Sequence, residues 1–240
     1  MSGQALPDRY ESARGQVQRV VVHVVARARH QAVGRFGLVP TPGGVGTPAF
    51  GPGVTVVRLG GESLFVERAG EVAITPLAGS TLRSLAEAAG ADVDAELTVG
   101  HDTPPAVDVD ETIDVDPAAL AAIGWWLALG VAAIDEVVAG LGPVASPART
   151  QVWPEHFDAG TNVSVGPGPN DRVNLGASVG DGFHPEPYLY VGPWGADRPG
   201  DAAYWNAPFG AVLGWADVAA AADPVATAVA FYREGLARFA

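Results

Sequence analysis

The sequence contains no cysteine, which excludes disulfide bonds, thiolate metal sites and thiol nucleophiles. It also contains no lysine, since all 14 basic residues are arginine. The absence of lysine excludes a Schiff-base amine, a phosphate-loop lysine and the usual attachment point of pyridoxal phosphate. Histidine, aspartate and glutamate are therefore the main side chains available for acid–base or metal chemistry. Arginine in place of lysine, with abundant alanine, valine and glycine, is typical of high-GC, actinobacterial-type genomes.

A concentrated basic surface is also missing. The formal net charge is −13, and 12 of the 27 acidic residues lie between Ser84 and Ala148, a stretch without arginine. Proteins that bind nucleic acid need clustered basic residues to displace counterions from the phosphates. We therefore expect neither nucleic acid nor a membrane among the partners of this protein.

Charged residues are few, at 17% of the 240 residues, whereas hydrophobic residues make up 48%. This length and composition are sufficient for a well-buried core. The 31 glycines and 20 prolines indicate many turns and hence many strands. Residues 1–16 are polar and contain no apolar signal segment, so we expect a flexible N-terminus and a soluble, cytoplasmic protein.

One uncharged run, residues 117–134, is long enough to be compared with a membrane span. It is rich in alanine and glycine, includes Trp125 and Trp126, and is flanked by Asp116 and by Asp135-Glu136. No positive residue marks a cytoplasmic side. We therefore interpret the run as a buried core helix rather than a span.

Turn signals and β-branched residues predict many strands. Residues 17–28 (VQRVVVHVVARA) are expected to form a long strand, and the Gly/Pro-rich residues 40–53 a loop. The other expected strands cover residues 34–39, 54–59, 63–68, 71–76, 151–153, 162–165, 172–178, 188–191 and 211–215. A two-residue hairpin signal, Gly60-Gly61, separates two of them.

Capping residues predict three helices. Ser80 is expected to cap a helix over 81–89 that ends at Gly90. Asp116-Pro117 and Asp223-Pro224 each place a capping aspartate before a proline at the first helical position. They predict a long helix over 117–139 and a final helix over 225–239.

These elements define an α+β fold, with antiparallel β-sheets in two pseudo-repeated halves, a long central buried helix and a C-terminal helix. The expected boundaries are residues 1–16 for the flexible N-terminus, 17–115 for a β-rich lobe, 116–142 for the central helix and 150–240 for a C-terminal αβ lobe. We expect the two lobes to form one compact unit.

The densest cluster of reactive residue types is Trp153 to Asp158. Within it Glu155, His156 and Asp158 are candidate catalytic residues, with His156 as acid–base or ligand and Asp158 orienting it. His156, His184 and Glu186 are candidate ligands for a divalent metal such as zinc, manganese or iron. The alternative is that the polar residues only hydrogen-bond a tight turn.

Aromatic residues accumulate in the same part of the chain. Trp153, Tyr188, Tyr190, Trp194 and Trp205 are candidate ligand-binding residues, because amphipathic aromatics beside turns often line small-molecule pockets. The alternative is that they form the core of the C-terminal lobe. His23 lies between valines and is interpreted as a core histidine.

Three other patterns in the sequence do not indicate a functional site. The acidic run 108–116 lacks the central glycine and closing glutamate of a calcium loop. No serine has a GxSxG context, and residues 43–46 lack the spacing of a dinucleotide-binding loop.

Residues 150–240 resemble a conserved bacterial family to which no activity is assigned. The similarity consists of the segments Trp153 to Asp158, Pro185 to Tyr190, Tyr204-Trp205-Asn206 and Gly210 to Leu213, followed by a closing helix. The resemblance implies that these segments form one unit and implies no reaction.

Two functions are consistent with the sequence. The first is a small-molecule-binding protein or enzyme that uses His, Asp and Glu chemistry, with or without a divalent metal, in an aromatic-lined C-terminal pocket. The alternative is a non-catalytic structural or interaction protein, such as a homodimer that packs through the helix with Trp125 and Trp126.

Overall fold

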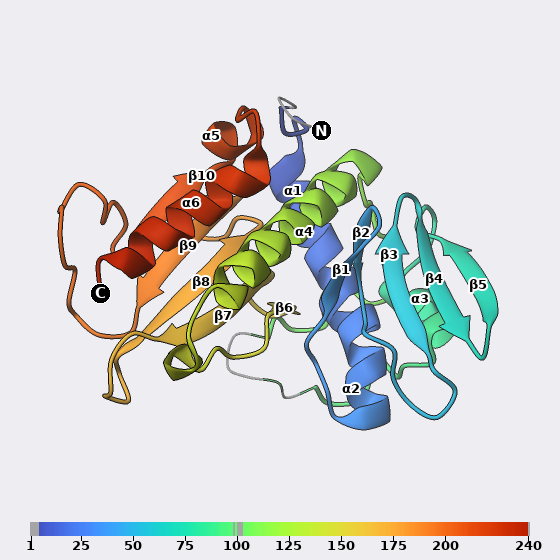
Figure 1. Cartoon of the computed structure of the whole chain (residues 1–240). Coiled ribbons are helices and arrows are strands. Elements are labelled where there is room, and N and C mark those ends of the chain that lie inside the picture. Colours follow the sequence, from blue (N-terminus) through green and yellow to red (C-terminus); the bar gives the residue numbers. More distant parts are fainter. Residues whose placement is uncertain (1–4, 98, 100–102, 240) are drawn as a thin grey trace. The chain divides into compact units, whose positions relative to one another are not determined.

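The fold combines helices with two antiparallel five-stranded sheets, which confirms the predicted α+β class (Figure 1). The computed structural model describes residues 5–97, 99 and 103–239. The sequence predicts a loop at His101, which lies outside the described residues. The α-helices are α1 (Tyr10–Val20), α2 (Arg27–Val33), α3 (Leu82–Ala89), α4 (Pro117–Ala139), α5 (Trp215–Ala219) and α6 (Pro224–Ala237). The strands are β1 (Val39–Thr41), β2 (Gly44–Gly46), β3 (Val56–Gly60), β4 (Ser63–Arg68), β5 (Glu71–Pro76), β6 (Gln151–Trp153), β7 (Asp158–Ser164), β8 (Arg172–Ser178), β9 (Tyr188–Pro193) and β10 (Ala211–Gly214).

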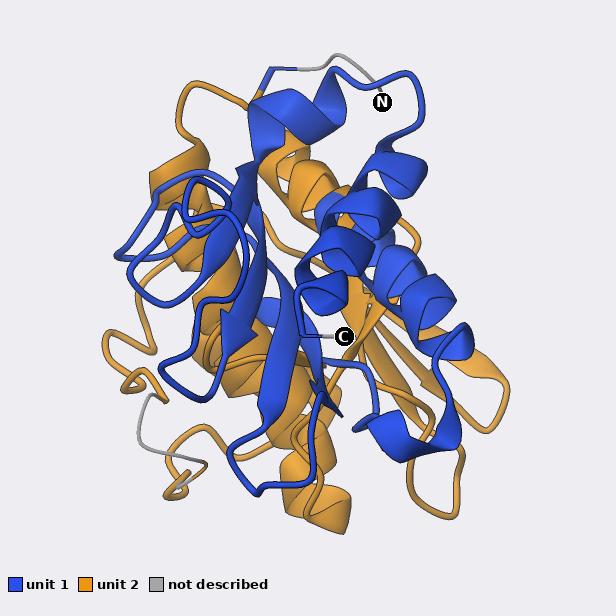
Figure 2. Ribbon diagram, turned by 60° about the vertical axis from the view of Figure 1, so that its left-hand side comes forward, with its two compact units in different colours: residues 1–5, 126–151, 158–240 blue, residues 6–125, 152–157 orange. Residues whose placement is uncertain are grey.

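The chain divides into two compact units (Figure 2). One, here called the N-terminal unit, contains residues 6–125 and 152–157. The other, here called the C-terminal unit, contains residues 1–5, 126–151 and 158–240. Helix α4 is therefore shared, with its first part in the N-terminal unit and the rest in the C-terminal unit.

Residues 10–33 form one continuous helix, in which a π-helical segment, Val21–Ala26, joins α1 to α2. The prediction of a strand over 17–28 is therefore wrong. Residues 1–16 were expected to be flexible, but residues 10–16 belong to this helix. Every residue from Val20 to Ala26 is at most 1% exposed. A helix that is buried all round shows no polar face, so its β-branched composition concealed its helical spacing.

The sheet of the N-terminal unit is a meander in the order β1-β2-β3-β4-β5. Strands β1 and β2 occupy part of the segment predicted as a loop, and of the strand predicted over 34–39 only Val39 belongs to a strand. The β3–β4 hairpin turns at Gly61-Glu62, one residue later than the Gly60-Gly61 signal indicated, because Gly60 pairs with Ser63. One face of the sheet is buried through side chains such as Leu59 and Leu64.

The backbone of helix α4 lies directly against the backbone of this sheet at Gly124. A Cβ atom added to Gly124 would come within 2.7 Å of the Cα atom of Gly44 on β2. No side chain fits between the two backbones at this point. The two glycines therefore set how closely the first part of α4 packs on the sheet.

The second sheet runs in the order β10-β9-β8-β7-β6, and its strands β7 to β10 belong to the C-terminal unit. Its strands β8, β9 and β10 begin at the predicted residues, although Trp215, predicted as the end of the last strand, begins α5. Leu175 and Ala177 of β8 are fully buried on one face. The second part of α4 packs against this face, since a Cβ on Gly130 would overlap the Cβ of Ala177.

The predicted starts of α4 and α6 are confirmed. The carboxylate of Asp116 accepts a hydrogen bond from the backbone N–H of Ala118 at 2.9 Å, and that of Asp223 from Ala226 at 3.0 Å. Helix α3 is capped by Thr81 rather than by Ser80, through a reciprocal capping box with Ser84.

Among the described residues, only α4 is long and apolar enough to cross a membrane. Of its most apolar 18-residue window, 61% is buried inside the protein. Trp126, for example, is fully buried and packs on Trp215 with a ring-centroid distance of 5.4 Å. Such burial is typical of the core helix of a soluble protein.

The Gly124 contact predicts a large asymmetry between two helical glycines of the same unit. Gly124→Ala should lower the free energy of unfolding by about 1–3 kcal/mol, because the new methyl group overlaps the β2 backbone. The control is Gly15→Ala at an exposed position of α1, where no atom lies within 4 Å of the added Cβ. That change should raise stability by about 0.5–1 kcal/mol. Urea unfolding measures both, and equal effects would contradict the close approach.

Candidate functional site

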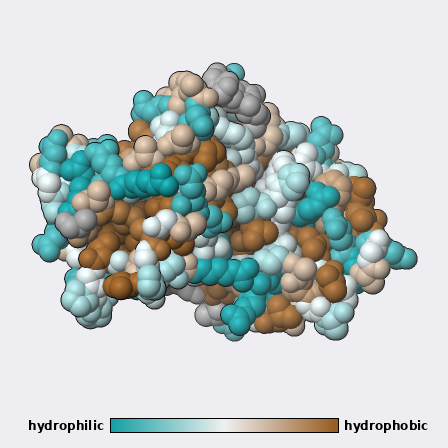
Figure 3. All heavy atoms as spheres, viewed as in Figure 1, coloured by the Kyte–Doolittle hydropathy of each residue, from teal (hydrophilic) through white to brown (hydrophobic). Residues whose placement is uncertain are grey.

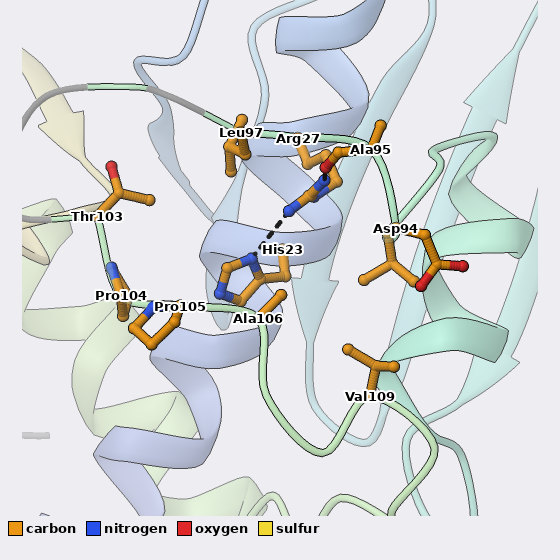
Figure 4. A pocket seen from close by; sticks show the side chains of 11 residues that line it. His23, Arg27, Asp94, Ala95, Leu97, Thr103, Pro104, Pro105, Ala106 and Val109 are labelled. Atoms are coloured by element: carbon orange, nitrogen blue, oxygen red, sulfur yellow. Dashed lines mark hydrogen bonds between the residues drawn. The ribbon is translucent and has the colours of Figure 1, made fainter.

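A cavity of about 300 Å³ lies in the N-terminal unit, between the π-helical segment and the chain that follows α3 (Figure 4). The helix contributes His23 and Arg27 to its wall, and the following chain contributes residues between Val93 and Val109. This volume is at the small end of the range for small-molecule pockets. π-Helical turns inside longer helices are frequently found at functional sites.

Arg27 is a buried cation, with 2% of its surface exposed. Its Nη1 atom donates to the backbone carbonyls of Asp92 at 3.1 Å and of Ala95 at 2.7 Å. Burial lowers the pKa of its guanidinium, and the charges of Asp92 and Asp94 oppose this change. No carboxylate oxygen of the described residues lies within ion-pair distance of it, and its Nε atom has no hydrogen-bond partner among them.

The contact between Arg27 and His23 fixes the state of the imidazole. Nη2 of Arg27 lies 3.3 Å from Nδ1 of His23, and the two side chains point toward one another (Figure 4). An arginine can only donate, so Nδ1 must be unprotonated and the ring proton sits on Nε2. Nε2 is enclosed and makes no hydrogen bond of normal length to a described residue, although the carbonyls of Pro104 and Pro105 lie near it.

His23 is accordingly held neutral. Burial is the main cause that lowers its pKa to about 4, and the positive charge of Arg27 adds to it. Charge on Arg19 acts in the same direction, while the Pro104 and Pro105 carbonyls oppose it. The wall of the cavity therefore carries one cation and a neutral imidazole with its N–H on Nε2.

Two further clamps hold the chain that forms the opposite wall. The Gln31 side chain donates to the carbonyl of Asp92 at 2.8 Å and accepts from its N–H at 2.9 Å. Arg83 binds the carboxylates of Asp94 and Asp110, each at 2.5 Å. The hydrogen bond from Arg83 also lowers the pKa of Asp110. Asp94 is thus engaged by Arg83, which leaves Arg27 as the cation of the cavity.

The residues predicted as catalytic occupy a turn and the strand after it. Residues Trp153 to Phe157 form a tight turn after β6, closed by a hydrogen bond from the N–H of Phe157 to the carbonyl of Trp153 at 2.7 Å. Phe157 is buried with a φ of 53°, an uncommon conformation for an aromatic residue. His156 is exposed, and one carboxylate oxygen of Glu155 is enclosed without a hydrogen-bond partner among the described residues.

Asp158 begins β7 in the C-terminal unit and is bound by Tyr190. The carboxylate accepts a short hydrogen bond from the Tyr190 hydroxyl, which lies across the intervening strand β8. Gly176 makes this reach possible, because a Cβ at that position would overlap the tyrosine ring. The ring of Tyr190 is partly exposed but its hydroxyl end is enclosed; burial there and the charge of Asp158 raise its pKa well above the usual value.

The five aromatic residues predicted to bind a ligand lie in separate places. Tyr188 and Tyr190 are neighbours, with ring centroids 6.2 Å apart. Trp194 is half exposed and donates from Nε1 to Asn174 at 2.8 Å. Trp205 instead stacks edge-on against Tyr204 at 5.0 Å, and Trp153 belongs to the N-terminal unit.

The predicted metal ligands do not form a cluster in the part of the chain that the structure describes, where no group of three or more His, Asp or Glu is placed to hold a metal. His184 and Glu186 are both exposed. Nδ1 of His184 lies 3.2 Å from the backbone nitrogen of Glu186, so the imidazole bonds within its own turn.

Sequence reasoning missed Arg27 and assigned His23 to the core without a role. A usable signal was present, because His23 and Arg27 are four residues apart and share one face of a helix. The strand assignment concealed it by separating the two side chains. A search against protein-family models, curated proteins and solved structures found no match to the chain.

The Tyr190–Asp158 bond predicts a measurable cost for removing one hydroxyl. Tyr190→Phe should lower the free energy of unfolding by about 1.5–3 kcal/mol, as for other hydrogen bonds to charged groups. Tyr204→Phe is the control, because its hydroxyl donates to the neutral carbonyl of Phe231 at 3.0 Å. It should cost only about 0.5–1.5 kcal/mol. Equal losses in urea unfolding would show that Asp158 is not a charged acceptor.

The low pKa of His23 predicts an acid-dependent loss of stability. The unfolded chain binds the proton near pH 6.5 and the folded protein only near pH 4. The contribution of neutral His23 to the free energy of unfolding should therefore be fully present above about pH 6.5. It should decrease by up to about 3 kcal/mol as the pH falls to about 4. Unfolding of the wild type and of His23→Gln across this range isolates the contribution, since the carboxylates are common to both. Parallel pH profiles would refute it.

Proposed function

We propose that this protein binds a small anionic molecule, a carboxylate or a phosphate ester, in the cavity beside His23 and Arg27. The observation that carries the proposal is the charge of Arg27, which is buried without a carboxylate partner among the described residues. Removing a charge from water costs several kcal/mol unless another group compensates for it. Two carbonyl dipoles, together with the charges of Asp92 and Asp94 beyond ion-pair distance, compensate for only part of a full charge.

An anion in the cavity would complete the compensation. Coulomb attraction to a guanidinium is strong in a poorly solvated wall, and arginine prefers carboxylate and phosphate oxygens. A small shift of the Pro104–Ala106 backbone would also expose the Nε2–H of His23 as a second donor. Because His23 stays neutral, it would add a hydrogen bond without adding charge.

The remaining wall indicates the size and character of the molecule. Apolar side chains such as Val93, Leu97 and Val109 line the cavity beside the polar groups. A cavity of about 300 Å³ accepts a metabolite-sized molecule rather than a nucleotide cofactor or a peptide. The expected ligand is therefore a short anion with an apolar portion.

The proposal keeps the small-molecule ligand expected from the sequence and places it in the N-terminal unit. Catalysis by Glu155, His156 and Asp158, and a cytoplasmic location, stay predictions from the sequence. The enclosed carboxylate oxygen of Glu155 is the observation that favours chemistry at that turn.

A thermal-shift panel tests the proposal. Small monocarboxylates and phosphate monoesters should raise the Tm, whereas amides and alcohols of the same size should not. A ligand at about 100 times its Kd adds about 2.7 kcal/mol of stability, which such a panel detects. Titration calorimetry then gives the affinity of each anion that responds.

Arg27→Gln should weaken that affinity at least about tenfold, because the charge is lost. Arg27→Lys retains a charge and should keep part of the binding. The matched control is Arg58→Gln, at a part-buried arginine of the same unit that is paired with Glu67 at 3.2 Å. Binding that survives Arg27→Gln, or an equal response to neutral analogues, would overturn the assignment.

A further inference from the structure

Strand β5 forms one edge of the sheet in the N-terminal unit. Two aliphatic side chains on it, Val72 and Ile74, are 54% and 60% exposed. Figure 3 shows apolar surface among hydrophilic atoms over this end of the sheet, in the region of β4 and β5. Natural edge strands usually carry a charge, a proline or a bulge that prevents pairing with another strand. In β5 the charge of Glu71 and the ring of Pro76 stand at the two ends, and residues 72–75 (VAIT) between them carry none of these.

The hairpin geometry fixes which backbone groups of β5 face outward. Strands β4 and β5 are joined by Ala69-Gly70, both with positive φ, as in a two-residue type I′ turn. In such a hairpin the closing pair, here Arg68 and Glu71, is hydrogen-bonded, and hydrogen-bonded pairs then alternate. The N–H and C=O groups of Val72 and Ile74 therefore point away from β4.

We propose that two copies of this chain associate through antiparallel pairing of their β5 strands, with Val72 opposite the partner's Ile74. A two-fold axis at Ala73 generates this register. It yields two hydrogen-bonded pairs, each exchanging both of its N–H···O=C bonds. Pro76 occupies the next outward position and has no N–H, so the pairing ends there.

The side chains on the outer face complement one another in this register. Phe65 of β4 lies beside Ile74, and Glu67 lies beside Val72. Pairing would align Phe65, Ile74 and the partner's Val72 in one apolar row, next to its symmetric copy. Arg58 covers Phe65 at 4.0 Å and binds Glu67 at 3.2 Å, so an ion pair borders the rows in each subunit.

No like charges oppose one another across this pairing, since Glu71 faces the partner's Thr75. The contact is isologous and uses both β5 edges, so it closes at a dimer and leaves none of these edges free. It differs from the helix-mediated dimer considered from the sequence, because Trp126 is fully buried against Trp215.

Sedimentation equilibrium of the full chain, from low micromolar to several hundred micromolar, tests the inference. The wild type should show a reversible monomer–dimer equilibrium. Ile74→Lys should raise the dissociation constant at least about tenfold, because it places a charge in the apolar rows. The control is Val144→Lys, at a valine that is 85% exposed outside any strand. It should leave the equilibrium unchanged.

A charge-pair design tests the register itself. Val72→Glu combined with Ile74→Lys places a glutamate opposite the partner's lysine in both hydrogen-bonded pairs, and should restore dimerisation relative to Ile74→Lys alone. Val72→Lys combined with Ile74→Lys should instead remain monomeric. A wild type that is monomeric throughout, or a dimer equally stable in Ile74→Lys, would overturn the inference. A dimer that Ile74→Lys weakens but the charge pair does not restore would refute the register.

Discussion

Helix α4 packs closely on a strand in each compact unit, and a glycine makes each contact possible. In the N-terminal unit Gly124 faces Gly44 of β2, and in the C-terminal unit Gly130 faces Ala177 of β8. Neither position has room for a larger residue without a shift of backbone or of a neighbouring side chain. This constraint explains why α4 carries glycine at these two positions, where a sheet approaches it closely.

A second constraint concerns Arg27, the one deeply buried arginine among the described residues of the N-terminal unit. Arginine keeps its proton in almost any environment, so Arg27 cannot escape the cost of burial by becoming neutral. The neighbouring His23 is the group that stays neutral: its Nδ1 accepts a hydrogen bond from Arg27, and its proton lies on Nε2. Carbonyls of the chain after α3 then approach the guanidinium, and the cavity forms where this packing is incomplete. The fold thus places the charge of Arg27 beside the cavity, which is the physical basis of the ligand proposal.

The sequence was most informative where the structural signal is local. The limits of β4, β5, β6 and β8 follow from alternation and turn residues, and Asp116 and Asp223 mark helix starts through their own side chains. The prediction failed at residues 17–28 because the buried, valine-rich part of this helix, residues 20–28, has the composition of a strand. Burial on all sides is a property of the whole fold, so no local pattern reveals it.

The candidate sites also differ in whether their residues are close in the sequence or are brought together only by the fold. Glu155, His156 and Asp158 were predicted as one site because they are close in the chain, and the structure places the first two on a turn and Asp158 on the strand after it. The cavity instead joins His23 and Arg27 to residues more than 60 positions later, a contact that only the fold creates. A motif search compares residues that are close in the sequence, so it could not find a cavity whose two walls are this far apart in the chain.

Two places in the N-terminal unit contradict the local rule that surrounds them. A histidine and an arginine lie within the otherwise apolar buried segment 20–28 of the first helix, and two aliphatic residues face solvent on an edge strand. Sequences that fold reliably agree across local and global levels, and their exceptions concentrate where function opposes stability. The two proposals supply a partner for each exception: an anion for Arg27, and a second β5 strand for Val72 and Ile74. A buried charge and an open sheet edge are both costly when left alone, so each is explained more simply as half of an interaction than as a defect of the fold.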